Sequence, residues 1–163
     1  METKTKSESK ADQKTNLQRT LVLAKPDAVH RGLVGQIINR FEERGLAMMG
    51  LRLLQMDAKL AEKLYEPHVG KPFYPPLVEY MTSGPIVAMV WEGVEAISII
   101  RTMLGATNPA QANPGTIRGD FAQRVDRNIV HGSDSPESAS REIPIFFEPS
   151  QLMPGHPAHT DWL

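Results

Sequence analysis

Side chains suited to binding phosphate are concentrated in one stretch of this 163-residue chain. No Lys or Arg occurs between Lys71 and Arg101, whereas cationic and neutral hydrogen-bonding side chains follow closely. They are Arg101, Thr107, Arg118, Arg124, Arg127 and Asn128. Arg presents a planar fork of donors to phosphate oxygens, and Thr hydroxyls and Asn amides add hydrogen bonds without ionising. The stretch therefore indicates a phosphate site, although ordinary solvated arginines would give the same spacing.

His131 ends this stretch, where a short apolar run gives way to the turn residues 132–134. A neutral imidazole is nucleophilic and can accept a phosphoryl group directly. Taken alone, the segment slightly favours a structural histidine. Ser133 and Asp134 do not suggest a hydrolase, since their placement beside His131 makes no catalytic triad and no G-x-S-x-G elbow is present.

Several other chemistries are excluded by the sequence. It contains no G-x-x-x-x-G-K-[ST] loop, G-x-G-x-x-G turn, H-E-x-x-H helix or EF-hand pattern, and no Cys for a thiolate metal site or nucleophile. The net charge of −1 offers no positive field for a dedicated nucleic-acid binder. No apolar run approaches the roughly 20 residues that span a bilayer, so we expect no membrane partner.

The chain has the length of one domain with a polar leader. Residues 1–17 are Lys-, Ser- and Thr-rich with few apolar side chains, which predicts a disordered leader. This leader lacks the features of a secretory or mitochondrial signal, so a cytoplasmic location is the default expectation. Residues 18–163 are expected to form the single folded domain.

Hydrophobic periodicity and turn residues predict the elements that must position the candidate residues. The expected strands cover 19–24, 46–56 with a bend or bulge at Gly50, 86–91 as a central strand, and 128–131, with an edge segment at 145–147. The expected helices cover 33–43, 59–66 after the cap Asp57, 77–81, 94–104, and a helix that begins at Pro136 after the cap Ser135. Two Asn-Pro pairs predict a long ordered loop over 106–119.

This order of elements indicates an α+β fold. Strand, helix, strand, strand, helix, strand is the sequence of a ferredoxin-like split βαβ sandwich, an antiparallel four-stranded sheet with helices on one face. Such a fold hosts many functions and selects none of them.

Six segments together resemble the nucleoside diphosphate kinase family. They are AKPDAV at 24–29, RGLVGQII at 31–38, SGPIVAMVWEG at 83–93, MLGATNPA at 103–110, PGTIRGDFA at 114–122 and NIVHGSDS at 128–135. The last is similar to the family's phosphohistidine signature. The resemblance covers about residues 19–147 and continues weakly to residue 162. It departs from the common pattern at Ala28, Tyr74 and residues 75–76, near the expected nucleotide entrance.

The resemblance implies a role for each matching position. His131 would accept the phosphoryl group on its δ nitrogen, with Glu142 orienting the ring. Phosphate, ribose and other active-site positions fall on Lys25, Tyr65, His68, Arg101, Thr107, Arg118 and Asn128. Phe73 and Val125 match the pair that holds the base on its two sides.

The implied activity is transfer of the γ-phosphate of a nucleoside triphosphate, usually ATP, to a nucleoside diphosphate by ping-pong exchange. Mg²⁺ would be bound through the nucleotide phosphates, with no metal ligand from the protein. One alternative is a nucleic-acid-binding or regulatory protein on the same fold. Another is a nucleotide-binding module without catalysis, for which the imidazole of His131 would have no use.

The resemblance also implies a homo-oligomer. The loop over 106–119 could hardly keep its shape alone, which suggests support from a neighbouring subunit. The residues through His159, Asp161 and Trp162 resemble the longer C-terminal end of hexameric members of the family. We therefore expect a hexamer in preference to a tetramer.

Overall fold

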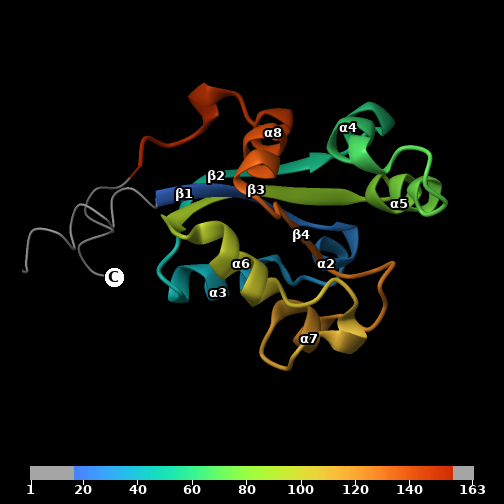
Figure 1. Ribbon diagram of the computed structural model, residues 1–163, viewed down its shortest axis with the longest axis horizontal. Coiled ribbons are helices and arrows are strands. Elements are labelled where there is room, and N and C mark those ends of the chain that lie inside the picture. The colour runs from blue at the N-terminus through green and yellow to red at the C-terminus, as the bar shows by residue number, and fades with distance from the viewer. Residues whose placement is uncertain (1–16, 156–163) are drawn as a thin grey trace, which may run out of the picture.

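Four antiparallel strands form one sheet in the computed structural model, which describes residues 17–155. The strands are β1 (Leu17–Ala24), β2 (Ala47–Gln55), β3 (Pro85–Val94) and β4 (Val130–Gly132), in the spatial order β2-β3-β1-β4. The order and the antiparallel pairing confirm the predicted fold class and the central position of β3 (Figure 1). The expectations for residues 1–16 and 156–163, including the disordered leader and Trp162, lie outside the described residues.

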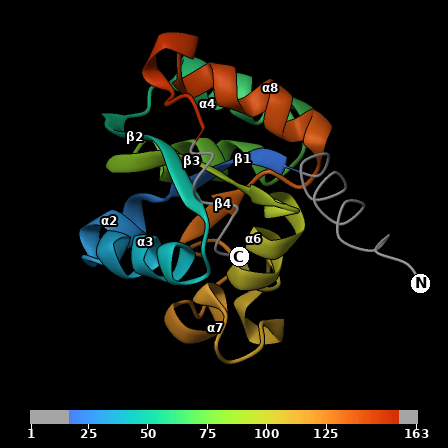
Figure 2. The same cartoon turned by 90° about the vertical axis from the view of Figure 1, so that its left-hand side faces the viewer.

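Helices cover both faces of the sheet, so the expectation of one covered face was wrong. The α-helices are α2 (Pro26–His30), α3 (Val34–Glu43), α4 (Ala58–Leu64), α5 (Tyr74–Met81), α6 (Ala96–Leu104), α7 (Ile117–Phe121) and α8 (Pro136–Phe146). Short 3-10 turns occupy Glu66–His68, Pro109–Gln111 and Pro149–Gln151. Figures 1 and 2 show α4 and α8 on one side of the sheet, and α3 and α6 on the other.

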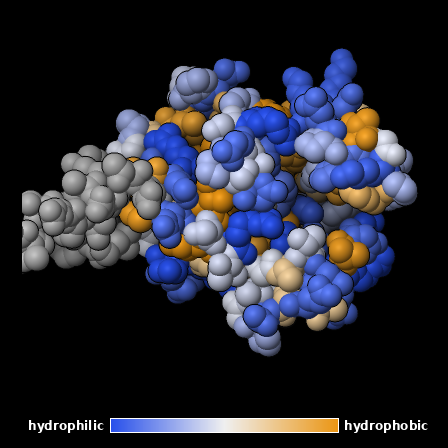
Figure 3. All heavy atoms as spheres, in the orientation of Figure 1, coloured by the Kyte–Doolittle hydropathy of each residue, from blue (hydrophilic) through white to orange (hydrophobic). Residues whose placement is uncertain are grey.

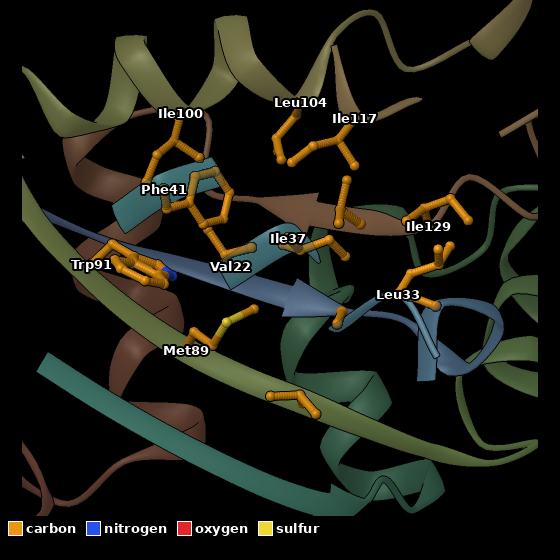
Figure 4. Packing of buried hydrophobic residues seen from close by; sticks show 14 of the residues in the cluster. Val22, Leu33, Ile37, Phe41, Met89, Trp91, Ile100, Leu104, Ile117 and Ile129 are labelled. Atoms are coloured by element: carbon orange, nitrogen blue, oxygen red, sulfur yellow. The ribbon is translucent and has the colours of Figure 1, made fainter. Parts of the chain in front are cut away.

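The composition of the central strands explains the two covered faces. Alternate residues of a strand point to opposite faces, and both Leu21 and Val22 of β1 are fully buried. A strand that is apolar on both faces needs cover on both. Val22 packs on the side of α3 and α6, where the Phe41 and Trp91 rings meet edge to face with centroids 5.2 Å apart (Figure 4). Leu21 packs on the opposite side, among buried residues of α4, α5 and α8.

Several local predictions are confirmed. The Asp57 carboxylate accepts a hydrogen bond from the Leu60 backbone N–H at 2.8 Å, which caps α4. The Ser135 hydroxyl accepts one from the Ser138 N–H at 3.0 Å and caps α8. The pairing of β2 with β3 shifts register at Gly50, as the predicted bulge requires.

Other boundaries were wrong for identifiable reasons. β1 begins at Leu17 rather than Arg19, because Leu17 pairs with Val94. The expected edge segment at 145–147 is the end of α8 and the residue after it, and the Phe147 N–H still donates to the Ile143 carbonyl at 3.0 Å. β4 starts at Val130 rather than residue 128, because Ile129 has a φ of 75° and cannot be extended.

The short helices α2 and α7 were not foreseen. α2 begins one residue after β1 ends, with Pro26 at its first position, where this Pro both ends the strand and starts a helix. α7 begins inside the expected loop, where the Thr116 hydroxyl accepts a hydrogen bond from the Gly119 N–H at 3.0 Å. Both helices place residues of the site described below.

The surface seen in Figure 3 is mostly polar, with smaller hydrophobic patches between the polar residues. Within residues 17–155, no helix has the length and apolar character required to cross a membrane.

Candidate active site

One cavity of about 930 Å³ brings all eleven candidate residues together. They are Lys25, Tyr65, His68, Phe73, Arg101, Thr107, Arg118, Val125, Asn128, His131 and Glu142. They come from the end of β1, the segment from α4 to α5, helices α6, α7 and α8, the loops beside them, and β4. Because these elements are far apart in the sequence, the cavity exists only in the tertiary fold.

His131 lies in β4 and pairs with Leu23 of the central strand β1, which fixes its backbone. Its Nε2 lies 2.6 Å from Oε1 of Glu142, a residue of α8 that is only 2% exposed. The second carboxylate oxygen of Glu142 accepts a hydrogen bond from the Ser133 hydroxyl at 3.3 Å. An ionised carboxylate can only accept, so Nε2 carries the proton and the lone pair is on Nδ1. Within residues 17–155, Nδ1 makes no hydrogen bond, and the His131 side chain is 22% exposed in the cavity.

Lys25 occupies the residue after β1, where the chain turns into α2. Its ammonium donates to the side-chain oxygen of Asn128 at 2.7 Å, and the Asn128 amide donates in turn to the Thr107 carbonyl at 3.0 Å. Burial, followed by the positive charge of Arg118, lowers the pKa of Lys25 to about 7. An anionic ligand would favour the charged form and so gain from this arrangement.

Arg118 of α7 is almost fully buried and fixes the backbone around the cavity. Its guanidinium donates to the carbonyl groups of Gly105, Asn128 and Val130 at 2.9, 3.2 and 2.7 Å. Burial and the nearby Arg101 lower the pKa of Arg118 to about 10, so it remains charged at neutral pH. A guanidinium has five N–H donors, and two of them remain for a ligand.

Aromatic rings line another side of the cavity. The Tyr65 and His131 rings meet edge to face with centroids 6.3 Å apart, and the Tyr65 hydroxyl is buried without a partner among residues 17–155. Burial, more than the Glu142 charge, raises the pKa of Tyr65. The centroids of the His68 and Phe73 rings lie 5.2 Å apart. Phe73 and Val125 are 50% and 58% exposed, which leaves their apolar surfaces open to a ligand.

The Arg-rich stretch divides into residues inside and outside the cavity. Arg124 does not line it, but forms an exposed ion pair with Asp126 at 2.6 Å. Arg127 does line it, and its guanidinium lies 4.3 Å from the centre of the Tyr80 ring. The count of arginines in the sequence therefore overstated the number that face the site.

Several further residues that no sequence pattern indicated also line the cavity. Tyr80 of α5 and Arg141 of α8 face the cavity, and Arg141 donates to the carbonyls of Lys63 and Leu64 at the end of α4. Neither residue belongs to a motif with a spacing of its own. The place of Arg141 next to Glu142 is no signal, because adjacent residues of a helix point in different directions, and its helical neighbour in the cavity lining is Ser138, three residues earlier.

Comparisons with known proteins agree with this geometry. The family model of nucleoside diphosphate kinase matches residues 18–152. The nucleoside diphosphate kinase of Thermosynechococcus vestitus is 54% identical over 147 residues, which cover 90% of this chain and 98% of that protein.

Two solved structures have the same fold. A halophilic nucleoside diphosphate kinase from Halobacterium salinarum in complex with CDP has a TM-score of 0.86 and 43% identity, covering 89% of this chain and 97% of that one. A transition state mimic of the Borrelia burgdorferi nucleoside-diphosphate kinase, with bound vanadate and ADP, has a TM-score of 0.83 and 36% identity. The match covers 87% of this chain and 94% of that one. The extent of the sequence match, together with a cavity lined by all eleven candidate residues, shows that this chain belongs to the nucleoside diphosphate kinase family.

Proposed function

We propose that His131 Nδ1 carries a phosphoryl group between a nucleoside triphosphate and a nucleoside diphosphate. As a member of its family, the chain is a phosphotransferase that acts on nucleotides. The observation that carries the proposal is the 2.6 Å contact from His131 Nε2 to Glu142, which commits one ring nitrogen, while the other makes no hydrogen bond to any residue in the described part of the chain.

The transfer takes place in two displacements. The lone pair on Nδ1 attacks the γ-phosphorus, the bond from that phosphorus to the bridging oxygen breaks, and the diphosphate leaves with the electron pair. The Nε2 proton stays in its hydrogen bond to Glu142, whose charge stabilises the positive ring. A terminal oxygen of a second diphosphate then attacks the phosphorus and releases the imidazole.

Cationic groups around His131 neutralise the charge that moves in this reaction. Lys25 and the two free donors of Arg118 lie in the same cavity, together with Arg101 and the hydroxyl of Thr107. Phosphoryl transfer requires mainly positioning and electrostatic stabilisation. Asn128 holds the Lys25 ammonium at 2.7 Å and so orients it toward the cavity.

The base would lie between Phe73 and Val125, which offer apolar surface and no donors or acceptors to base edges. The Tyr65 hydroxyl and His68 would contact the phosphates from the side of α4. The bound CDP of the Halobacterium salinarum relative and the bound ADP of the Borrelia burgdorferi relative support a site that accepts both pyrimidine and purine.

Mg²⁺ fits this site only as a companion of the nucleotide. Within residues 17–155, no group of three His, Asp or Glu side chains is placed to hold a metal ion. Mg²⁺ prefers phosphate oxygens and waters to a cage of protein ligands. The bound ion would neutralise phosphate charge, and ATP would be the usual donor.

The proposal is tested with γ-labelled ATP. The intact protein should acquire label that is lost in acid and retained in base, at close to one group per chain, and the label should pass to added nucleoside diphosphate. His131→Ala should take up no label and show no transfer, while its affinity for ADP stays within a few-fold. Transfer at the normal rate by His131→Ala would refute the proposed acceptor.

Nucleic-acid binding as the principal function is not favoured, because the family is one of nucleotide phosphotransferases and the net charge is −1. A single catalytic domain over residues 18–163 and a cytoplasmic location complete the proposal.

The exposed loop before α7 and the resemblance at the C-terminal end support a hexamer. Light scattering at micromolar concentration should give the mass of six chains, and a mass of two or four would contradict it.

A further inference from the structure

We infer that Asp27 is a positioning residue for this phosphoryl transfer, because its carboxylate holds Ile129 in a strained turn between Asn128 and His131. The inference rests on the proposed function. Asp27 is not among the residues that line the cavity, so it would act through the backbone of the site and not by touching the nucleotide.

The strained turn is centred on Ile129. This residue has a φ of 75°, and the Val130 N–H donates to the Asn128 carbonyl at 2.8 Å across it. That bond defines a γ-turn whose central residue lies in the left-handed region, a rare and strained conformation. A β-branched residue is especially unfavourable there, so surrounding contacts must hold it.

Asp27 supplies one of those contacts. One oxygen of its carboxylate accepts the Ile129 N–H at 3.2 Å, and the other accepts the hydroxyl of Tyr80 in α5. The Ile129 carbonyl accepts the backbone N–H of Lys25 at 2.9 Å. Both backbone groups of the strained residue are therefore bonded to the short segment from Lys25 to Asp27.

The Ile129 side chain supplies the second contact. It is fully buried in the core on the α3 and α6 side of the sheet, with Leu33 in the same cluster (Figure 4). A buried apolar side chain tethers the residue but does not by itself select a positive φ. The directional bond from Asp27 to the amide does select the orientation of that peptide.

The turn matters because of its neighbours. Asn128 directs its side-chain oxygen to the Lys25 ammonium at 2.7 Å, and His131 follows two residues after Ile129. If the peptide before Ile129 rotates into a relaxed conformation, Asn128 and His131 change orientation relative to Lys25. A shift of this kind can slow a reaction up to about 100-fold without removing any reacting group.

The test compares Asp27→Ala, which removes both acceptors, with Asp27→Asn, whose amide oxygen can still accept the Ile129 N–H. Asp57→Ala is the matched control, because it also removes an Asp side chain that accepts a backbone N–H, at α4 and outside the cavity lining. Rapid quench with γ-labelled ATP measures both the rate at which label is acquired and the final label per chain.

Asp27→Ala should acquire label about 10-fold to 100-fold more slowly, with the same final label per chain and an ADP affinity within about threefold. Asp27→Asn should recover most of the rate, and Asp57→Ala should keep the wild-type rate. Three results would overturn the inference. They are an Asp27→Ala rate within about twofold of the control, a loss of final label equal to the loss of rate, or an Asn variant as slow as the Ala variant.

Hydrogen exchange keeps this test separate from the proposed function. The peptide containing Ile129 should exchange faster in Asp27→Ala than in Asp57→Ala, as followed by mass spectrometry. If the wild-type protein took up no label, the phosphohistidine proposal would fail. Unchanged exchange at Ile129 in Asp27→Ala would refute the role of Asp27 on its own.

Discussion

Replacement of Glu142 by Gln separates the charge of this residue from its shape. The carboxylate is 2% exposed, accepts from His131 Nε2 at 2.6 Å, and has its other oxygen bonded to Ser133. Gln has nearly the same size, and its amide oxygen can still accept the imidazole N–H. The variant therefore keeps the ring orientation and loses the negative charge opposite the ring that becomes positive.

The size of the effect follows from the strength of the bond. A hydrogen bond to a charged group contributes about 1.5–3 kcal/mol, and a neutral one about 0.5–1.5 kcal/mol. The difference is about 1–1.5 kcal/mol, and each 1.36 kcal/mol in a barrier changes the rate about 10-fold. Glu142→Gln should thus lower the rate of His131 phosphorylation roughly 10-fold. Glu142→Ala loses the whole interaction and should lower it by about 10-fold to 150-fold.

The assay is a rapid quench of enzyme mixed with γ-labelled ATP, followed by separation of labelled protein. ADP affinity, measured by calorimetry, should stay within about threefold, because both carboxylate oxygens are bonded inside the protein. Urea unfolding shows whether each variant is folded under the conditions of the assay. A Glu142→Gln rate equal to wild type would refute the electrostatic role, and a fall in rate matched by an equal fall in ADP affinity would show a binding role in its place.

Three further outcomes are expected. Burial and a nearby arginine lower the pKa of Lys25 to about 7, so between pH 7 and 9 the unfolded chain holds a proton that the folded chain releases. As the pH rises from 7 to 9, the free energy of unfolding of the wild type, measured with urea, should increase by about 2 kcal/mol relative to that of Lys25→Met. Parallel curves of unfolding free energy against pH would contradict the lowered pKa. Phe73→Ala should weaken ADP and CDP binding alike, by about 10-fold in calorimetry, and a loss confined to one base would contradict the apolar stacking site. A Cβ at Gly119 would clash with the backbone carbonyl oxygen of Asn113, so Gly119→Ala should cost about 1–3 kcal/mol of stability and lower kcat by displacing Arg118. Gly35→Ala, which places its Cβ in open space, serves as the control for Tm.

The sequence alone determined the order of the four strands and the longer helices, and its resemblance to a family suggested the residues of the site. The apolar run before Lys25, the helical periodicity over 33–43 and the caps Asp57 and Ser135 are local signals, and each predicted element exists. The segment around His131 matched a family pattern, and the eleven candidate residues that this pattern implies all line one cavity. The elements were predicted from short-range spacing and residue types, whereas the roles of the site residues were predicted from the family resemblance.

The tertiary structure decided the boundaries and the contacts between distant segments. Helices cover both faces of the sheet because β1 is apolar on both. The continuous apolar run at 21–24 is consistent with this cover, and the expectation of one covered face came from the assumed topology and not from that run. The end of α8 remains helical because its packing against the sheet outweighs the strand propensity of residues 145–147.

The strained backbone at Ile129 is the clearest case that local propensity could not reveal. An Asn-Ile-Val run favours an extended strand, and a positive φ at Ile is locally unfavourable. The turn exists because Asp27, about a hundred residues earlier in the chain, accepts its amide, and because the Ile129 side chain is fully buried. Local sequence carries the residue types for the chemistry, whereas bonds between segments distant in sequence hold those residues in a geometry that local preferences oppose.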